Sequence, residues 1–252
     1  MNFRFPRRAL LAFITAIALP IALPAIASAA PTSFSLSALT LGAGTDPNLA
    51  STTTFNAGAG TPQSITLALA PGLLASAAAN PSCLATAQTS STTPGTGCNV
   101  GNGTFLTPAP VTYNAYVIPA PTPADVAGVE VITSGANTAT GAIDLRTSPT
   151  VGLNVSLTLS GLPFASTMTG MTLNVNGTLN GNQFTRLPTS CVADTSSVVV
   201  AYSGTPSSET ATNTTAAAAT PTGCSSLPFT PTLLASATKD TGDGNVAITT
   251  DV

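Results

Sequence analysis

Strict alternation of apolar and small polar residues over residues 151–160 constrains the fold of this chain most strongly. The polar positions hold glycine, asparagine, serine and threonine, and the apolar positions are Val151, Leu153, Val155, Leu157 and Leu159. A period of two places the apolar side chains on one face of a β-strand and the polar ones on the other. The pattern returns at 171–179, after a connection rich in turn residues. The two segments therefore predict neighbouring antiparallel strands with one buried and one solvated face.

Shorter segments with the same pattern occur along the rest of the chain, with turn residues between them. Many short strands at regular spacing predict an all-β fold, and we expect one or two immunoglobulin-like β-sandwiches. A stretch rich in serine, threonine, alanine and proline, residues 205–222, is expected to be an insert outside the core. The other expected strands are 33–41, 51–55, 63–70, 111–118, 126–133, 142–146, 197–202, 232–238 and 245–251.

Two cysteine-containing motifs form an internal echo. A Pro/Ser-Cys at 81–83 is followed by Thr-Gly-Cys at 96–98, and the same order recurs at 188–191 and 222–224. The echo predicts two related sandwich modules, residues 30–140 and 141–252, each of the size of an immunoglobulin-like domain. One continuous sandwich over residues 30–252 is the alternative.

The first 29 residues predict a secretory signal peptide. Three arginines precede an apolar stretch, residues 9–26, and Ala27-Ser28-Ala29 supplies the small residues of a cleavage site. An uncleaved membrane anchor is the alternative, because the apolar stretch is nearly long enough to span a bilayer. Two prolines within it would kink such a helix. We therefore expect a secreted or cell-surface protein with no membrane insertion after cleavage.

Basic residues are too few for a phosphate-binding surface. The chain has 6 basic and 9 acidic residues, and beyond the predicted signal peptide only Arg146, Arg186 and Lys239 are basic. Three cations cannot form a stripe that follows a nucleic-acid backbone, so nucleic-acid binding is excluded. The expected partner is a surface protein or a glycan.

Four cysteines follow the predicted signal peptide: Cys83, Cys98, Cys191 and Cys224. An even number of cysteines in an exported chain predicts disulfides, with three connectivities open. Sequential pairing, Cys83–Cys98 and Cys191–Cys224, would close one short loop in each half. A zinc site is the alternative, but the chain has no CxxC motif and no histidine. We expect no metal and no cofactor.

The absence of histidine also restricts catalysis. It removes every Ser-His-acid and Cys-His arrangement. Carboxylate pairs close in sequence are Asp125 with Glu130 and Asp240 with Asp243, but nothing around them marks a site, and solvated carboxylates are the preferred interpretation. Residues 240–245 offer oxygen ligands for calcium, yet they lack the EF-hand spacing and suit an ordinary hairpin turn. We predict that the protein is not an enzyme.

Several short strings occur along the chain after the predicted signal peptide. They include Asn80-Pro81-Ser82-Cys83, Leu187-Pro188-Thr189-Ser190-Cys191, and the longest, Thr-Gly-Cys-Ser-Ser-Leu-Pro-Phe-Thr-Pro at 222–231. Together they resemble a group of secreted actinobacterial β-rich proteins without an established activity. The resemblance spans most of the chain after the signal peptide. It implies an exported β-rich protein and supplies no site residue.

These observations together predict an exported, non-enzymatic protein with a structural or adhesive role at the cell surface. One alternative is a sandwich module that binds a carbohydrate or another small ligand. The other is an outer-envelope β-barrel, because the same alternation describes a lipid-facing strand. Proline-rich connections and two disulfide loops favour the sandwich over the barrel.

Overall fold

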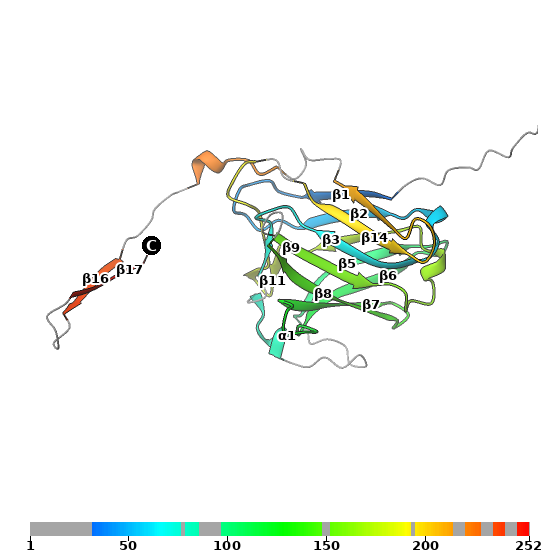
Figure 1. The fold of residues 1–252 in the computed structure, drawn as a ribbon, viewed down its shortest axis with the longest axis horizontal. Coiled ribbons are helices and arrows are strands. Elements are labelled where there is room, and N and C mark those ends of the chain that lie inside the picture. Colours follow the sequence, from blue (N-terminus) through cyan, green and yellow to red (C-terminus); the bar gives the residue numbers. More distant parts are fainter. Residues whose placement is uncertain are drawn as a thin grey trace, which may run out of the picture.

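A computed structural model gives the structure of residues 32–76, 79–85, 97–147, 152–192, 195–213 and 220–227, together with the backbone of 234–239 and 246–251. Strands are the main regular structure of the described chain, beside one short α-helix and a few 3₁₀ turns, and the all-β prediction is confirmed (Figure 1). The predicted signal peptide and the Asp240 and Asp243 side chains lie outside the described residues.

Eleven strands form one continuous sheet in which every neighbouring pair is antiparallel. Its strand order is β1-β2-β10-β5-β6-β7-β8-β9-β3-β14-β15. The strands are β1 (Ser33–Ala38), β2 (Leu49–Thr54), β3 (Pro62–Ala68), β5 (Asn99–Leu106), β6 (Val111–Ile118), β7 (Ala127–Thr133), β8 (Thr138–Arg146), β9 (Gly152–Thr158), β10 (Gly170–Val175), β14 (Ser197–Tyr202) and β15 (Ser208–Thr212).

Smaller elements close the ends of this sheet or follow it. Two-residue strands pair as β4 (Leu74–Ala75) with β13 (Thr185–Arg186) and as β11 (Thr178–Leu179) with β12 (Asn182–Gln183), and β16 (Leu234–Lys239) pairs with β17 (Val246–Asp251). The helical elements are α1 (Ser82–Ala85) and 3₁₀ turns at Ala57–Ala59, Ala165–Thr167 and Cys224–Ser226. Over the part of the chain that the structure describes, no helix is both long and apolar enough to cross a membrane.

The predicted immunoglobulin-like arrangement is not confirmed, since the long strands belong to a single sheet. Strands from the two sides of residue 140 alternate within it: β10 lies between β2 and β5, and β3 lies between β9 and β14. The halves that the cysteine echo suggested therefore share one sheet and one hydrophobic core.

The alternating segment 151–160 contains β9, and the segment 171–179 contains β10 followed by the two-residue strand β11, so strands form as predicted, but β9 and β10 are not neighbours. β9 pairs with β8 and β3, whereas β10 pairs with β2 and β5. The connection between them buries Leu159, Leu162 and Met168, so it crosses the end of the core instead of turning tightly. A period of two identifies a strand, but it does not identify the partner of that strand.

The sheet curls until its two edge strands meet through side chains. The side-chain amide of Asn213 accepts a hydrogen bond from the Leu36 backbone N–H (3.3 Å) and donates one to the Leu36 carbonyl oxygen (2.9 Å). The Glu209 carboxylate on β15 accepts hydrogen bonds from the Thr32 N–H (2.8 Å) and the Asn56 side chain (2.5 Å). We call the junction of β1 with β15 and Asn213 the seam. At the seam, the Asn213 side-chain amide forms the two hydrogen bonds with the Leu36 backbone that a neighbouring strand would otherwise form.

Glycine permits the tight curl at positions such as Gly141 on β8. A Cβ atom there would overlap the backbone carbonyl oxygen of Ser156 on the adjacent strand β9. Glycine inside a strand is typical of a place where another backbone approaches closely or the sheet bends sharply.

The segment 205–222 was expected to lie outside the core, and its first part contradicts that expectation. It contains β15, which pairs with β14, and Asn213, whose side chain is buried. β15 has no fully buried residue, because one of its faces is solvated and it forms the edge of the sheet. Its sequence therefore carries no apolar alternation that would reveal a strand.

Both disulfides join the cysteines in sequential order, as the sequence analysis expected. Cys83–Cys98 has an S–S distance of 2.03 Å, and Cys191–Cys224 has one of 2.01 Å. Cys83 and Cys98 are buried in the core, whereas Cys191 is exposed.

Acidification is expected to weaken the seam through Glu209. The Thr32 N–H, followed by the Asn56 amide, holds the pKa of the Glu209 carboxyl below its ordinary value. A carboxyl whose pKa is lowered by folding stabilises the protein above the pKa of an unfolded glutamate, about 4.3, and this contribution is lost as the pH falls through the lower folded value. Urea unfolding of wild type and Glu209→Gln at neutral pH and at about pH 3 checks this. The wild type should lose more stability on acidification than the variant, and equal losses would contradict the prediction.

Candidate functional site

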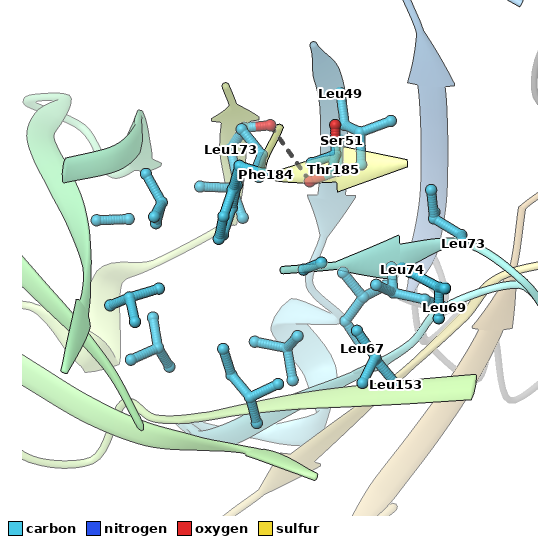
Figure 2. Close-up of a pocket in the computed structure, with 18 of the residues that line it drawn as sticks. Leu49, Ser51, Leu67, Leu69, Leu73, Leu74, Leu153, Leu173, Phe184 and Thr185 are labelled. Carbon is cyan, nitrogen blue, oxygen red and sulfur yellow. Dashed lines mark hydrogen bonds between the residues drawn. The ribbon is translucent and has the colours of Figure 1, made fainter. Parts of the chain in front are cut away.

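The inward face of the curled sheet encloses an apolar cavity of about 100 Å³. Strands from both halves of the chain build its wall. Figure 2 shows Leu49, Ser51 and Leu173 on one side of the cavity and Leu67 and Leu153 on the opposite side. β2 and β10 supply the first group, and β3 and β9 supply the second. The two strands with the clearest alternation, β9 and β10, therefore face each other across this space.

A second cavity of about 60 Å³ adjoins the first. Six residues line both cavities, and we call them the waist: Ser51, Leu67, Ala115, Val129, Val155 and Leu173. Five of the six are apolar, and they come from six different strands. The two spaces are therefore compartments of one apolar interior.

Three of the few hydroxyl groups in the wall donate to backbone carbonyl oxygens, and a fourth, that of Thr53, belongs to the smaller cavity. Thr185 donates to the Pro47 carbonyl (2.6 Å), Ser51 to the Leu173 carbonyl (3.5 Å) and Tyr113 to the Thr172 carbonyl (2.7 Å). Burial raises the pKa of the Tyr113 hydroxyl far above its ordinary value, so this group stays neutral. None of the described residues that line either cavity is charged. The wall therefore offers carbon atoms and almost no hydrogen-bonding capacity.

Cavities of this size are unusual in a protein interior. Native cores are packed nearly as densely as organic crystals, with few voids larger than a water molecule. At about 24 cal/mol per Å³, two empty cavities of about 100 and 60 Å³ would destabilise the fold by on the order of 4 kcal/mol. An apolar cavity of about 150 Å³ stays dry and binds benzene or xenon in a well-studied engineered protein. This interior can accommodate an apolar molecule in the same way.

The larger cavity approaches the surface at the ribbon formed by β4 and β13. Leu74 on β4 lines the cavity, and yet 47% of its surface is exposed. Arg186 lies directly opposite Leu74 in the ribbon. Next to the ribbon, the Ser76 backbone N–H donates a hydrogen bond to the Phe184 carbonyl oxygen (2.7 Å). Each strand of this ribbon has only two residues, and the half-exposed Leu74 belongs to it.

Asp125, one of the carboxylates considered from the sequence, lies at the surface and lines neither cavity. Asp125 hydrogen-bonds to Asp144 on β8, a partner that sequence proximity did not indicate. The hydrogen bond with Asp125 raises the pKa of Asp144, while the hydrogen bonds with Asp144 and Thr122 lower the pKa of Asp125. Both residues are partly exposed, and Asp125 lines a surface groove together with Thr140, Ser156 and other residues.

Glu130, the acidic residue close to Asp125 in sequence, is not part of this pair, and its burial contradicts the expectation of a solvated carboxylate. It lies on β7 opposite Tyr116 and Thr140, and burial raises the pKa of its carboxyl. Among the residues described, no group of three or more histidine, cysteine, aspartate or glutamate side chains could hold a metal ion. The calcium interpretation of Asp240 and Asp243 falls on residues that the structure does not describe.

Comparison of the chain with protein-family models, with curated proteins and with solved structures gives no match. The candidate site is therefore defined by its geometry alone. Sequence reasoning did not identify it, although one signal was present: Ala115 is a small residue at an inward position of β6, between Tyr113 and Val117.

Proposed function

We propose that this chain is an exported, non-enzymatic binding protein that holds a small apolar molecule inside its curled sheet. The observation that supports the proposal is the pair of adjoining cavities with an uncharged, almost wholly carbon wall. Two disulfides fit an oxidising compartment outside the cytoplasm, as expected for a secreted protein. Ligand binding here corresponds to the small-ligand alternative of the sequence analysis.

A structural or adhesive role at the cell surface is the second candidate function. It is favoured by a row of uncharged hydroxyl side chains across five neighbouring strands: Ser35, Thr52, Thr172, Thr104 and Thr112. These residues lie on the outer face of the sheet, where they could hydrogen-bond to a glycan or to a surface protein. The two candidate functions use opposite faces of the same strands and can be tested separately.

Filling the waist is expected to abolish binding of a small apolar probe. Ala115 lines both cavities, so Ala115→Leu would place additional carbon atoms where the ligand lies. With toluene at about ten times its Kd, wild type should gain about 1.4 kcal/mol of stability, measured as a rise in Tm. Ala115→Leu should show no such gain, and its own Tm without toluene should stay close to that of wild type because the added side chain occupies empty space.

The matched control places the same side chain on the other face of the strand. Asn114 is the neighbour of Ala115 on β6 and is exposed, so Asn114→Leu should retain the full toluene effect. If wild-type Tm is insensitive to toluene, or if both variants respond as wild type does, binding in the interior is refuted.

A further inference from the structure

We propose that the two cavities form one elongated site and that its ligand is an uncharged molecule with a linear alkyl chain, which lies along the strands through both compartments. This inference rests on the proposed function and specifies the ligand class. A compact ligand such as a single ring would need only the larger cavity.

The order of the lining residues along each strand supports an elongated site. Leu69, directly after β3, lines the larger cavity, Leu67 on β3 lines both, and Ile65 on β3 lines the smaller one. On β10, Val175, Leu173 and Met171 follow the same order, and β2, β6 and β9 repeat it. Alternate residues over four positions cover about 13 Å at about 3.3 Å per residue. The site therefore extends parallel to the strands and is longer than it is wide.

The chemistry of the wall selects the class of molecule. Burial of a charged head group within a carbon-lined space would carry a large desolvation penalty without a partner charge, and no described lining residue supplies one. A methylene chain gains about 0.8 kcal/mol for each CH₂ group that it buries, which corresponds to about a fourfold gain in affinity. An uncharged alkyl chain thus gains affinity along the whole length of the site.

The two ends of the site differ, and this difference defines the orientation. The end at β4 and β13 carries the half-exposed Leu74, whereas the far end is closed by the buried residues Phe34, Ile65 and Val198. A ligand with one polar terminus would place that terminus at the Leu74 end, close to water, and its alkyl end against Val198. The β4–β13 ribbon is then the way into the site.

A chain-length series tests the proposal. Binding of butan-1-ol, hexan-1-ol and octan-1-ol to the full chain is measured by calorimetry. The affinity of wild type should increase about fourfold for each added methylene up to octan-1-ol. Val198→Phe should fill the smaller cavity, leave butan-1-ol binding unchanged and weaken octan-1-ol binding by about tenfold or more.

Adjacent and milder variants control for effects on folding. Val199, the next residue on β14, faces outward with 38% exposure, so Val199→Phe should bind every alcohol as wild type does. If Val198→Phe does not fold, Val198→Leu should give the same selective loss for octan-1-ol with a smaller magnitude.

The outcomes separate this inference from the proposed function. Toluene binding without dependence on alcohol chain length, or octan-1-ol binding that Val198→Phe leaves unchanged, would overturn the elongated site while the interior binding function stands. Failure of wild type to bind toluene and every alcohol would overturn both.

Discussion

Phe105→Ala is expected to lower the free energy of unfolding by about 4 kcal/mol, the largest effect of a single substitution that we predict. Phe105 on β5 is completely buried. Its ring lies 4.6 Å from the ring of Tyr113 and 5.5 Å from that of Phe164, measured between centroids. Truncation therefore removes a full aromatic side chain, leaves a cavity and breaks two ring contacts, each of which contributes about 1 kcal/mol.

Urea unfolding checks this prediction, with the midpoint reporting stability and the slope reporting the area exposed. Thr104→Ala is the matched control, because Thr104 precedes Phe105 and faces the solvated side of the sheet, and its effect should stay within about 0.5 kcal/mol. A loss below about 2 kcal/mol for Phe105→Ala would mean that the aromatic cluster is not packed as described.

The sequence predicted the strands well wherever one face of the strand is buried. Leu153, Val155 and Leu157 all point inward from β9, as their alternation required. The partners of the strands were not predictable in the same way. β10 inserts between β2 and β5, which precede it by more than sixty residues, because the side chains that complete the core come from distant segments. Local periodicity contains no information about such pairings.

The candidate site was less predictable than the fold. A cavity depends on the summed volumes of side chains from several strands, so the small size of Ala115 becomes informative only when its neighbours across the interior are known. The carboxylate pair illustrates the same limit: Asp125 hydrogen-bonds to Asp144 on β8, whereas the acidic residue close to it in sequence, Glu130, is buried on β7. Proximity along the chain is a poor guide to proximity in a sheet.

Removing the Cys191–Cys224 disulfide is expected to destabilise the protein by about 4 kcal/mol, compared with about 3 kcal/mol for Cys83–Cys98, on the loop-entropy account. The two bridges span 33 and 15 residues along the chain, and the longer loop restricts the unfolded chain more. Double alanine variants, compared by urea unfolding, test the order of the two effects. The slope should rise in each variant, because an unfolded chain without the bridge exposes more surface.

Under mild reduction of the native protein, the Cys191–Cys224 bridge should be cleaved before Cys83–Cys98, although its removal is expected to destabilise the protein more. Cys191 is exposed and open to attack by an external thiol, whereas Cys83 is fully buried and becomes accessible only when the core opens. Mass spectrometry after thiol alkylation should therefore find Cys191 and Cys224 modified first, and equal labelling of all four cysteines would contradict the buried position of Cys83–Cys98. The loop closed by Cys191–Cys224 contains β14 and β15, and thus one side of the seam together with Val198 at the far end of the cavities. Its selective reduction is accordingly expected to weaken octan-1-ol binding before the core unfolds, which links the more exposed disulfide to the proposed ligand site.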